Sequence, residues 1–188
     1  MTGIPTTFNW TSRDPRDSAL FPSSYAMTYR FITEDHCGET VTTILKGIRN
    51  NKEDRIARLE WSGNDGWGRA VMGRLSMPMA DMMRREGYAT RDRLFTGPDG
   101  YIYMWTTAAN GELHLLDPTG FKIAFYRMVK STLRYMGQEV CGELHILPKD
   151  GGIVLHPPLM DMIVITAMLY RFSVQRGVGL QPTSSAFN

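Results

Sequence analysis

The chain has 188 residues, a length that suits one domain of ordinary size. Hydrophobic residues make up 43% of it and charged residues 21%, which excludes a disordered, collagen-like or coiled-coil protein as a description of the whole chain. The 21 basic and 19 acidic side chains leave a net charge of only +2, too balanced to indicate nucleic-acid binding or strong attraction to anionic membranes.

The N-terminal residues are polar and include Pro5, Pro15 and Pro22. We expect residues 1–24 to form an N-terminal arm or an edge segment. This stretch has neither the basic start nor the apolar run of a secretory signal, so we expect a cytoplasmic protein. Cys37 and Cys141 form no CxxC pair and are too few for a structural zinc site. We expect no metal and no cofactor.

From residue 25 onward the sequence has the pattern of β-strands. Large apolar residues alternate with small or polar ones over residues 27–33, and residues 39–45 are rich in Thr, Val and Ile. The 18 glycines and 10 prolines gather in turn-like clusters that recur about every ten residues, which is typical of an antiparallel sandwich or barrel. Further strands are predicted over residues 55–61, 101–105, 112–116, 121–127 and 140–147.

Two segments interrupt this rhythm with helical signals. Residues 77–86 follow a capping Ser76, carry Pro78 in the first turn and stop at Gly87, which predicts a short side helix. Residues 159–174 are apolar around nearly the whole helical circumference, as in a helix buried on all sides or a membrane span. At about 1.5 Å per residue this helix is roughly 24 Å long, shorter than the roughly 30 Å bilayer core, so a buried core helix is favoured.

These elements predict a mainly β domain over residues 25–180, in which an antiparallel barrel surrounds the core helix 159–174. Residues 181–188 are expected to form a flexible tail. Asp161 lies near the start of the core helix, where a carboxylate can accept free backbone N–H groups. We expect that role to be structural.

Three motifs in this order carry a resemblance to a known family: Arg58-Leu59-Glu60-Trp61, the F-T-G-P-D-G-x-x-Y-x-W run that begins at Phe95, and the closing apolar helix. Over residues 8–176 the chain resembles a fungal domain family of unknown function in the tubby C-terminal-like superfamily. Tubby, the phospholipid scramblases and the plant LURP-one-related proteins are its relatives. The resemblance implies a β-barrel threaded by a hydrophobic C-terminal helix.

The resemblance also implies lipid binding, because tubby domains bind phosphoinositides through a basic patch. The nearest basic segment in this chain is interrupted by Glu86 and Asp92, so a solvated surface is the alternative interpretation. The candidate contacts to a phosphate or lipid headgroup are Arg84, Arg85, Arg91 and Arg93.

A Gly-Glu-Leu-His repeat places Glu112 with His114 and, thirty-one residues later, Glu143 with His145. Residues i and i+2 of a strand share a face, so each copy presents one carboxylate and one imidazole together. On neighbouring strands these four groups could bind a divalent metal or act as general acids and bases. The alternative is that the leucines face the core and the polar side chains face water. His36, beside Cys37 in a predicted loop, completes the catalytic candidates.

Aromatic side chains supply the candidates for binding an apolar ligand, with packing in the core as the alternative. These candidates are Trp61, Trp67, Tyr101, Tyr103, Trp105 and His156.

The sequence thus favours a cytoplasmic binding module for a lipid or another hydrophobic small molecule, or a protein that docks on a membrane surface. One alternative is an enzyme that moves protons on an apolar metabolite, in a cyclisation or isomerisation within a pocket at the barrel mouth. A protein–protein adaptor is the other. No recognisable nucleotide-binding or hydrolase motif is present in the sequence.

Overall fold

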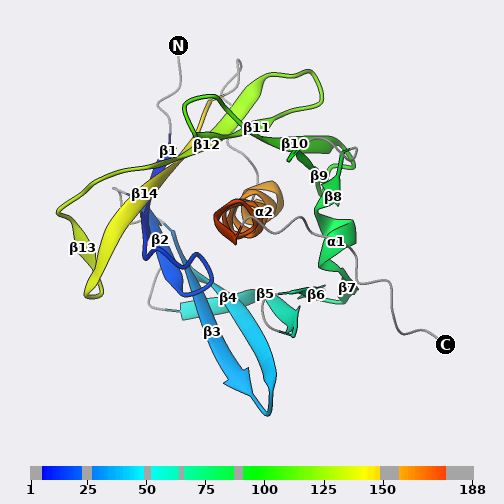
Figure 1. Cartoon of the computed structure of the whole chain (residues 1–188), viewed down its shortest axis with the longest axis vertical. Coiled ribbons are helices and arrows are strands. Elements are labelled where there is room, and N and C mark those ends of the chain that lie inside the picture. Colours follow the sequence, from blue (N-terminus) through cyan, green and yellow to red (C-terminus); the bar gives the residue numbers. More distant parts are fainter. Residues whose placement is uncertain are drawn as a thin grey trace.

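The computed structural model describes residues 6–22, 27–48, 52–63, 66–86, 91–148 and 157–176. In these residues a 14-stranded antiparallel sheet curves around the C-terminal helix α2 (Pro157–Arg176), as Figure 1 shows. The strands follow the order β7-β6-β5-β4-β3-β2-β1-β14-β12-β11-β10-β9-β8, and β13 pairs with β14 beside this path.

The strands have the following bounds: β1 (Thr6–Thr11), β2 (Ser18–Pro22), β3 (Thr28–His36), β4 (Glu39–Ile48), β5 (Lys52–Ser62), β6 (Gly66–Met72), β7 (Leu75–Pro78), β8 (Arg84–Arg85), β9 (Arg93–Thr96), β10 (Ile102–Thr107), β11 (Leu113–Leu116), β12 (Lys122–Met128), β13 (Arg134–Tyr135) and β14 (Gln138–Ile146).

The sheet is open. Its first and last strands in the pairing order, β7 and β8, do not pair with each other. The short helix α1 (Met79–Met82) contacts both strands and lies between them in Figure 1. The prediction of a mainly β, antiparallel fold with one C-terminal and one short helix is confirmed, whereas closure of the sheet into a barrel is not.

The N-terminal strands lie inside the sheet. β1 pairs with β14 on one side and with β2 on the other, and β2 continues to β3. We expected these residues to form an arm or an edge segment, but residues 6–22 lie within the sheet. Their two strands connect β3 on one side with β14 on the other. Phe8 and Trp10 of β1 are buried in the core. Few local signals predict such a strand, because its partner β14 is more than a hundred residues away.

The short helix is smaller than the predicted segment 77–86. Met77 and Pro78 pair with β6, and Arg84 and Arg85 pair with β9, so only Met79–Met82 is helical. Sheet pairing at both ends therefore overrode the local helix signals. The buried side chains of Met79 and Met82 attach this turn to the core.

Helix α2 fills the space that the sheet surrounds. Its residues from Ile163 to Ser173 are all buried, which agrees with its apolar circumference. The indole N–H of Trp105 donates to the Thr166 hydroxyl (2.9 Å), and Trp61 packs on Phe172 with ring centroids 4.8 Å apart. No helix in the described part of the chain is long and apolar enough to cross a bilayer. The predicted core helix is confirmed.

Asp161 has a different structural role from the predicted cap. Helix α2 begins at Pro157, so its first turn contains no acidic residue. The Asp161 carboxylate instead accepts hydrogen bonds from the Tyr29 hydroxyl and the Lys46 ammonium group, both at 2.7 Å. Burial, together with this carboxylate, raises the pKa of Tyr29, so the hydroxyl remains a donor. The cluster fastens α2 to β3 and β4.

Candidate functional site

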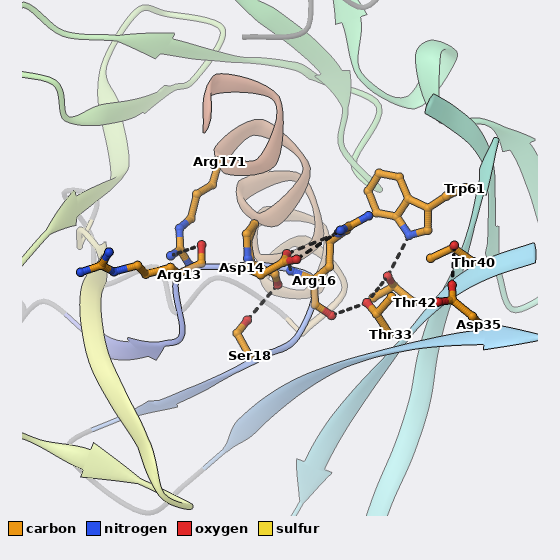
Figure 2. A network of polar contacts seen from close by, with 11 residues as sticks. Arg13, Asp14, Arg16, Ser18, Thr33, Asp35, Thr40, Thr42, Trp61 and Arg171 are labelled. Carbon is orange, nitrogen blue, oxygen red and sulfur yellow. Dashed lines mark hydrogen bonds and ion pairs between the residues drawn. The ribbon is translucent and has the colours of Figure 1, made fainter. Parts of the chain in front are cut away.

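The loop between β1 and β2, residues 12–17, passes the C-terminal end of α2 (Figure 2). Arg16 lies over the rings of Phe172 and Trp61, 4.6 and 5.3 Å from their centroids. Although burial raises the pKa of Asp14, hydrogen bonds from Arg16 hold it below its ordinary value. Ser12 adopts a left-handed backbone (φ 61°), an uncommon conformation for a residue with a side chain. Polar contacts thus hold a strained turn against the helix.

Arg171 of α2 reaches this loop from the helix. Its Nη2 donates to the backbone oxygens of Ser12 (2.7 Å) and Arg13 (3.3 Å). The guanidinium lies between two aromatic rings, 5.1 Å from the ring centroids of Trp10 and of Tyr126. Only 2% of the residue is exposed. A full positive charge is therefore buried at this point of the core.

The pairing of this guanidinium is incomplete. Its Nε and Nη1 are buried and have no hydrogen-bond partner, and no carboxylate in the described part of the chain forms an ion pair with it. Cation–π contacts and carbonyl acceptors offset only part of the cost of burying a charge. Arg171 has an unused capacity to bind an anion.

A cavity of about 1040 Å³, called here the Arg171 cavity, opens beside this side chain. It lies between the β1–β2 loop, the segment that follows β12, the start of β14 and the end of α2. Its volume is at the upper end of the range for small-molecule sites, and most of its wall is apolar. The lining residues are Ser12, Arg13, Met128, Val129, Lys130, Ser131, Thr132, Gln138, Glu139, Val140, Cys141, Arg171 and Gln175.

Positive charge exceeds negative charge around the Arg171 cavity. Arg13, Lys130 and Arg171 line it, whereas Glu139 is the one carboxylate among its lining residues. Glu139 also forms an exposed ion pair with Arg134 at 3.5 Å. The charged side chains that line the cavity therefore favour an anion.

Cys141 and Tyr126 complete the polar surroundings of Arg171. The Cys141 thiol lies 2.6 Å from the Ser12 carbonyl oxygen, and Arg171 Nη2 lies 3.3 Å from its sulfur. Within the described part of the chain, the buried Tyr126 hydroxyl has no hydrogen-bond partner. Burial raises the pKa of Tyr126 to about 12, against a smaller opposing effect of Arg171. The Tyr126 hydroxyl therefore supplies no negative charge at neutral pH.

Sequence reasoning did not find this site. Asp161 and Arg171 are the charged residues of the apolar segment 159–174, and that rarity was the available signal. In the predicted segment 159–174 Arg171 lies near the C-terminal end, where a positive charge suits the helix dipole. Helix α2 continues to Arg176, so Arg171 is not in its last turn. Arg171 lies close to Ser12 and Cys141 only because β1 pairs with β14, which is more than a hundred residues away in the sequence.

The two Glu-His pairs share one face of the sheet but are not on neighbouring strands. Strand β12 lies between β11 and β14, and Phe125 separates the two imidazoles. The ring of His145 stacks on Phe125 at 4.4 Å, and His114 meets its edge at 6.3 Å. In the described part of the chain no group of three or more His, Cys, Asp or Glu side chains is arranged to hold a metal. The hypothesis of one four-residue cluster is wrong.

Each pair instead forms a separate hydrogen bond within its strand. His114 Nε2 lies 2.9 Å from a Glu112 carboxylate oxygen, and His145 Nε2 lies 2.8 Å from Glu143. The hydrogen bond with His114 lowers the pKa of Glu112. Burial raises the pKa of Glu143, but hydrogen bonds from Arg127 and His145 outweigh it and lower the value. His36, at the exposed end of β3, similarly contacts Glu34 at 3.2 Å.

The described aromatic candidates lie in different surroundings. Trp61, Tyr103 and Trp105 are buried in the core, which is the packing alternative. Tyr101 is exposed, and Trp67 is half-buried with the Arg93 guanidinium 6.0 Å from its ring. His156 lies outside the described residues.

The arginine candidates include one buried side chain. Arg84 and Arg85 are exposed on β8 and pair with β9, where Arg85 lies opposite Arg93. Burial, and then repulsion from Arg85, lowers the pKa of Arg93. Arg91 is exposed in the segment before β9. A basic surface therefore exists here, but Arg93 faces the interior beside Trp67.

Comparison with known families gives one match. A model described as "Family of unknown function (DUF6593)" matches residues 13–171. No curated protein and no solved structure matches the chain. The resemblance to tubby C-terminal-like proteins stays a prediction.

Proposed function

Because the chain belongs to the Family of unknown function (DUF6593), we propose its function from its own geometry: it is a binding module for a lipid or a similar hydrophobic small molecule. The ligand occupies the Arg171 cavity. The observation that carries the proposal is the cavity itself, which has room for a lipid chain and a mostly apolar wall.

Exposed apolar side chains at the cavity support the same function. Met128, a lining residue, is 71% exposed, and Leu133, which follows the lining residue Thr132, is 57% exposed. Removing apolar surface from water contributes a favourable free energy of about 25 cal/mol per Å². A hydrophobic ligand covering these side chains would therefore be stabilised both inside the cavity and at its mouth.

Titration with Nile red, a neutral apolar dye, tests this proposal. We expect saturable binding with a blue-shifted emission, and at least tenfold weaker binding after Val129→Trp, which fills the cavity. Leu75→Trp on the far edge strand β7 is the matched control, because Leu75 is exposed and outside the cavity. Equal loss in both variants, or no saturable binding to the wild type, would overturn the proposal.

Docking on a membrane surface is the second candidate function. Tyr101, Ile102 and Phe121 are exposed, and their turns lie at one end of the sheet because Met104 pairs with Leu116. Aromatic and apolar side chains at such tips can enter a lipid interface. Flotation with phosphatidylcholine vesicles should carry the wild type and leave Phe121→Asp behind; equal flotation of both proteins would remove this candidate.

A further inference from the structure

The buried positive charge of Arg171 indicates which chemical group the ligand presents to it. A guanidinium group has five N–H donors and carries a positive charge. Its acceptors are two backbone oxygens and the Cys141 sulfur, all reached through Nη2. Nε and Nη1 have no acceptor among the described residues, although Arg171 is only 2% exposed. Such a charge is costly unless an anion compensates it.

We propose that the ligand of the Arg171 cavity is an amphiphile whose head is an oxyanion, a carboxylate or a phosphate monoester, placed against Arg171 with its apolar chain along Met128, Val129 and Val140. This inference rests on the proposed binding function and adds the charge of the ligand. Lys130 and Arg13 line the same cavity and strengthen the attraction. Guanidinium groups suit both kinds of head because two N–H groups of the planar fork can bind two oxygens of a carboxylate or of a phosphate.

A purely structural role for Arg171 explains less of the geometry. Two backbone carbonyls require only a neutral donor, such as the amide of Gln. The cation–π contacts with Trp10 and Tyr126 use the positive charge, but they leave Nε and Nη1 without an acceptor among the described residues. Ser12, whose carbonyl binds Arg171, has a left-handed backbone, and strained residues of this kind gather at binding sites. An anion bound where Arg171 lines the cavity would explain both the strained backbone of Ser12 and the buried charge of Arg171.

Four ligands with the same ten-carbon chain separate the head from the tail: decanoate, decyl phosphate, decan-1-ol and decylammonium. Binding of each to the full chain is measured by calorimetry at neutral pH, below the concentration at which it aggregates. We expect at least one of the two anions to bind tenfold or more tightly than decan-1-ol, and decylammonium to bind most weakly. The anion that binds more tightly identifies the head.

Substitutions of Arg171 test whether this residue causes the preference for anionic ligands. Arg171→Met should bring the anion-to-alcohol ratio close to one while decan-1-ol still binds, and Arg171→Lys should keep part of the preference. Arg74→Met is the matched control, because Arg74 is exposed in the turn between β6 and β7. If Arg171→Met does not fold, Lys130→Met and Arg13→Met should each lower the ratio severalfold.

The outcomes separate the two proposals. If decan-1-ol binds as tightly as both anions, the oxyanion inference is overturned while the proposed function stands. If no ten-carbon ligand binds, the proposed function itself fails. An anion preference that survives in Arg171→Met, or in both substitute variants, would place the anion elsewhere and overturn the assignment.

Discussion

Replacing Asp161 by leucine tests whether the buried cluster at the start of α2 stabilises the fold. The Asp161 carboxylate lies 2.7 Å from both the Lys46 ammonium and the Tyr29 hydroxyl. The side chains of Lys46 and Asp161 are 11% and 21% exposed. Removing one member of a buried ion pair costs about 3–5 kcal/mol, and residual exposure places this pair at the lower end. We expect Asp161→Leu to lower the free energy of unfolding by about 3 kcal/mol.

A double-mutant cycle isolates the contribution of the ion pair. Lys46→Met leaves Asp161 with the Tyr29 hydroxyl and partial access to water, so its cost should be smaller. In the double variant no charge is left unpaired, and we expect it to be more stable than the sum of the single effects predicts, by about 1–3 kcal/mol. Urea unfolding, followed by tryptophan fluorescence, gives all four free energies.

The control for this cycle is Asp81→Leu, in which an exposed carboxylate of α1 is replaced. A surface change of this kind should alter stability by about 0.5 kcal/mol or less. The reasoning would be refuted if Asp161→Leu cost no more than this control, or if the effects of Asp161→Leu and Lys46→Met were additive.

Two further predictions concern the sheet. A Cβ on Gly142 would lie 2.6 Å or less from atoms of the buried Tyr126 ring, so Gly142→Ala should cost about 1–3 kcal/mol and lower the melting temperature; an unchanged melting temperature would contradict this contact. The pKa values of Glu112 and Glu143 are lowered in the folded protein, so their stabilisation is present above about pH 4.5 and is lost as the pH falls through the folded values. The urea midpoint should therefore fall between about pH 5 and pH 3, and less steeply in a Glu112→Gln/Glu143→Gln variant, whereas an identical slope would contradict it.

Local patterns predicted several elements of this fold. The two-residue alternation over residues 27–33 corresponds to β3, and the Thr, Val and Ile content of residues 39–45 corresponds to β4. The apolar circumference of residues 159–174 corresponds to the buried α2. A hydrophobic periodicity depends only on which face of one segment is buried. It can therefore be recognised without knowing which other segment packs against that face. β1 and the length of α1 were missed because pairing with distant strands determines them.

The candidate site shows the same division more sharply. The Gly-Glu-Leu-His repeat placed each glutamate beside its histidine, because residues i and i+2 share a face of a strand. It said nothing about β12, which separates the two pairs, because strand order is not encoded in local spacing.

The sequence by itself determined the strand pattern, the apolar core helix and the near-balance of charge. Only the tertiary structure decided what surrounds the charged residues of that helix. Asp161 pairs with Lys46, whereas Arg171 lies beside a cavity and has no carboxylate partner among the described residues. The physical reason is that hydrophobic periodicity acts within a segment, whereas compensation of a buried charge depends on groups that folding brings together. The Ser12 oxygen and the Arg171 guanidinium, 159 residues apart, meet only when β1 and α2 pack together.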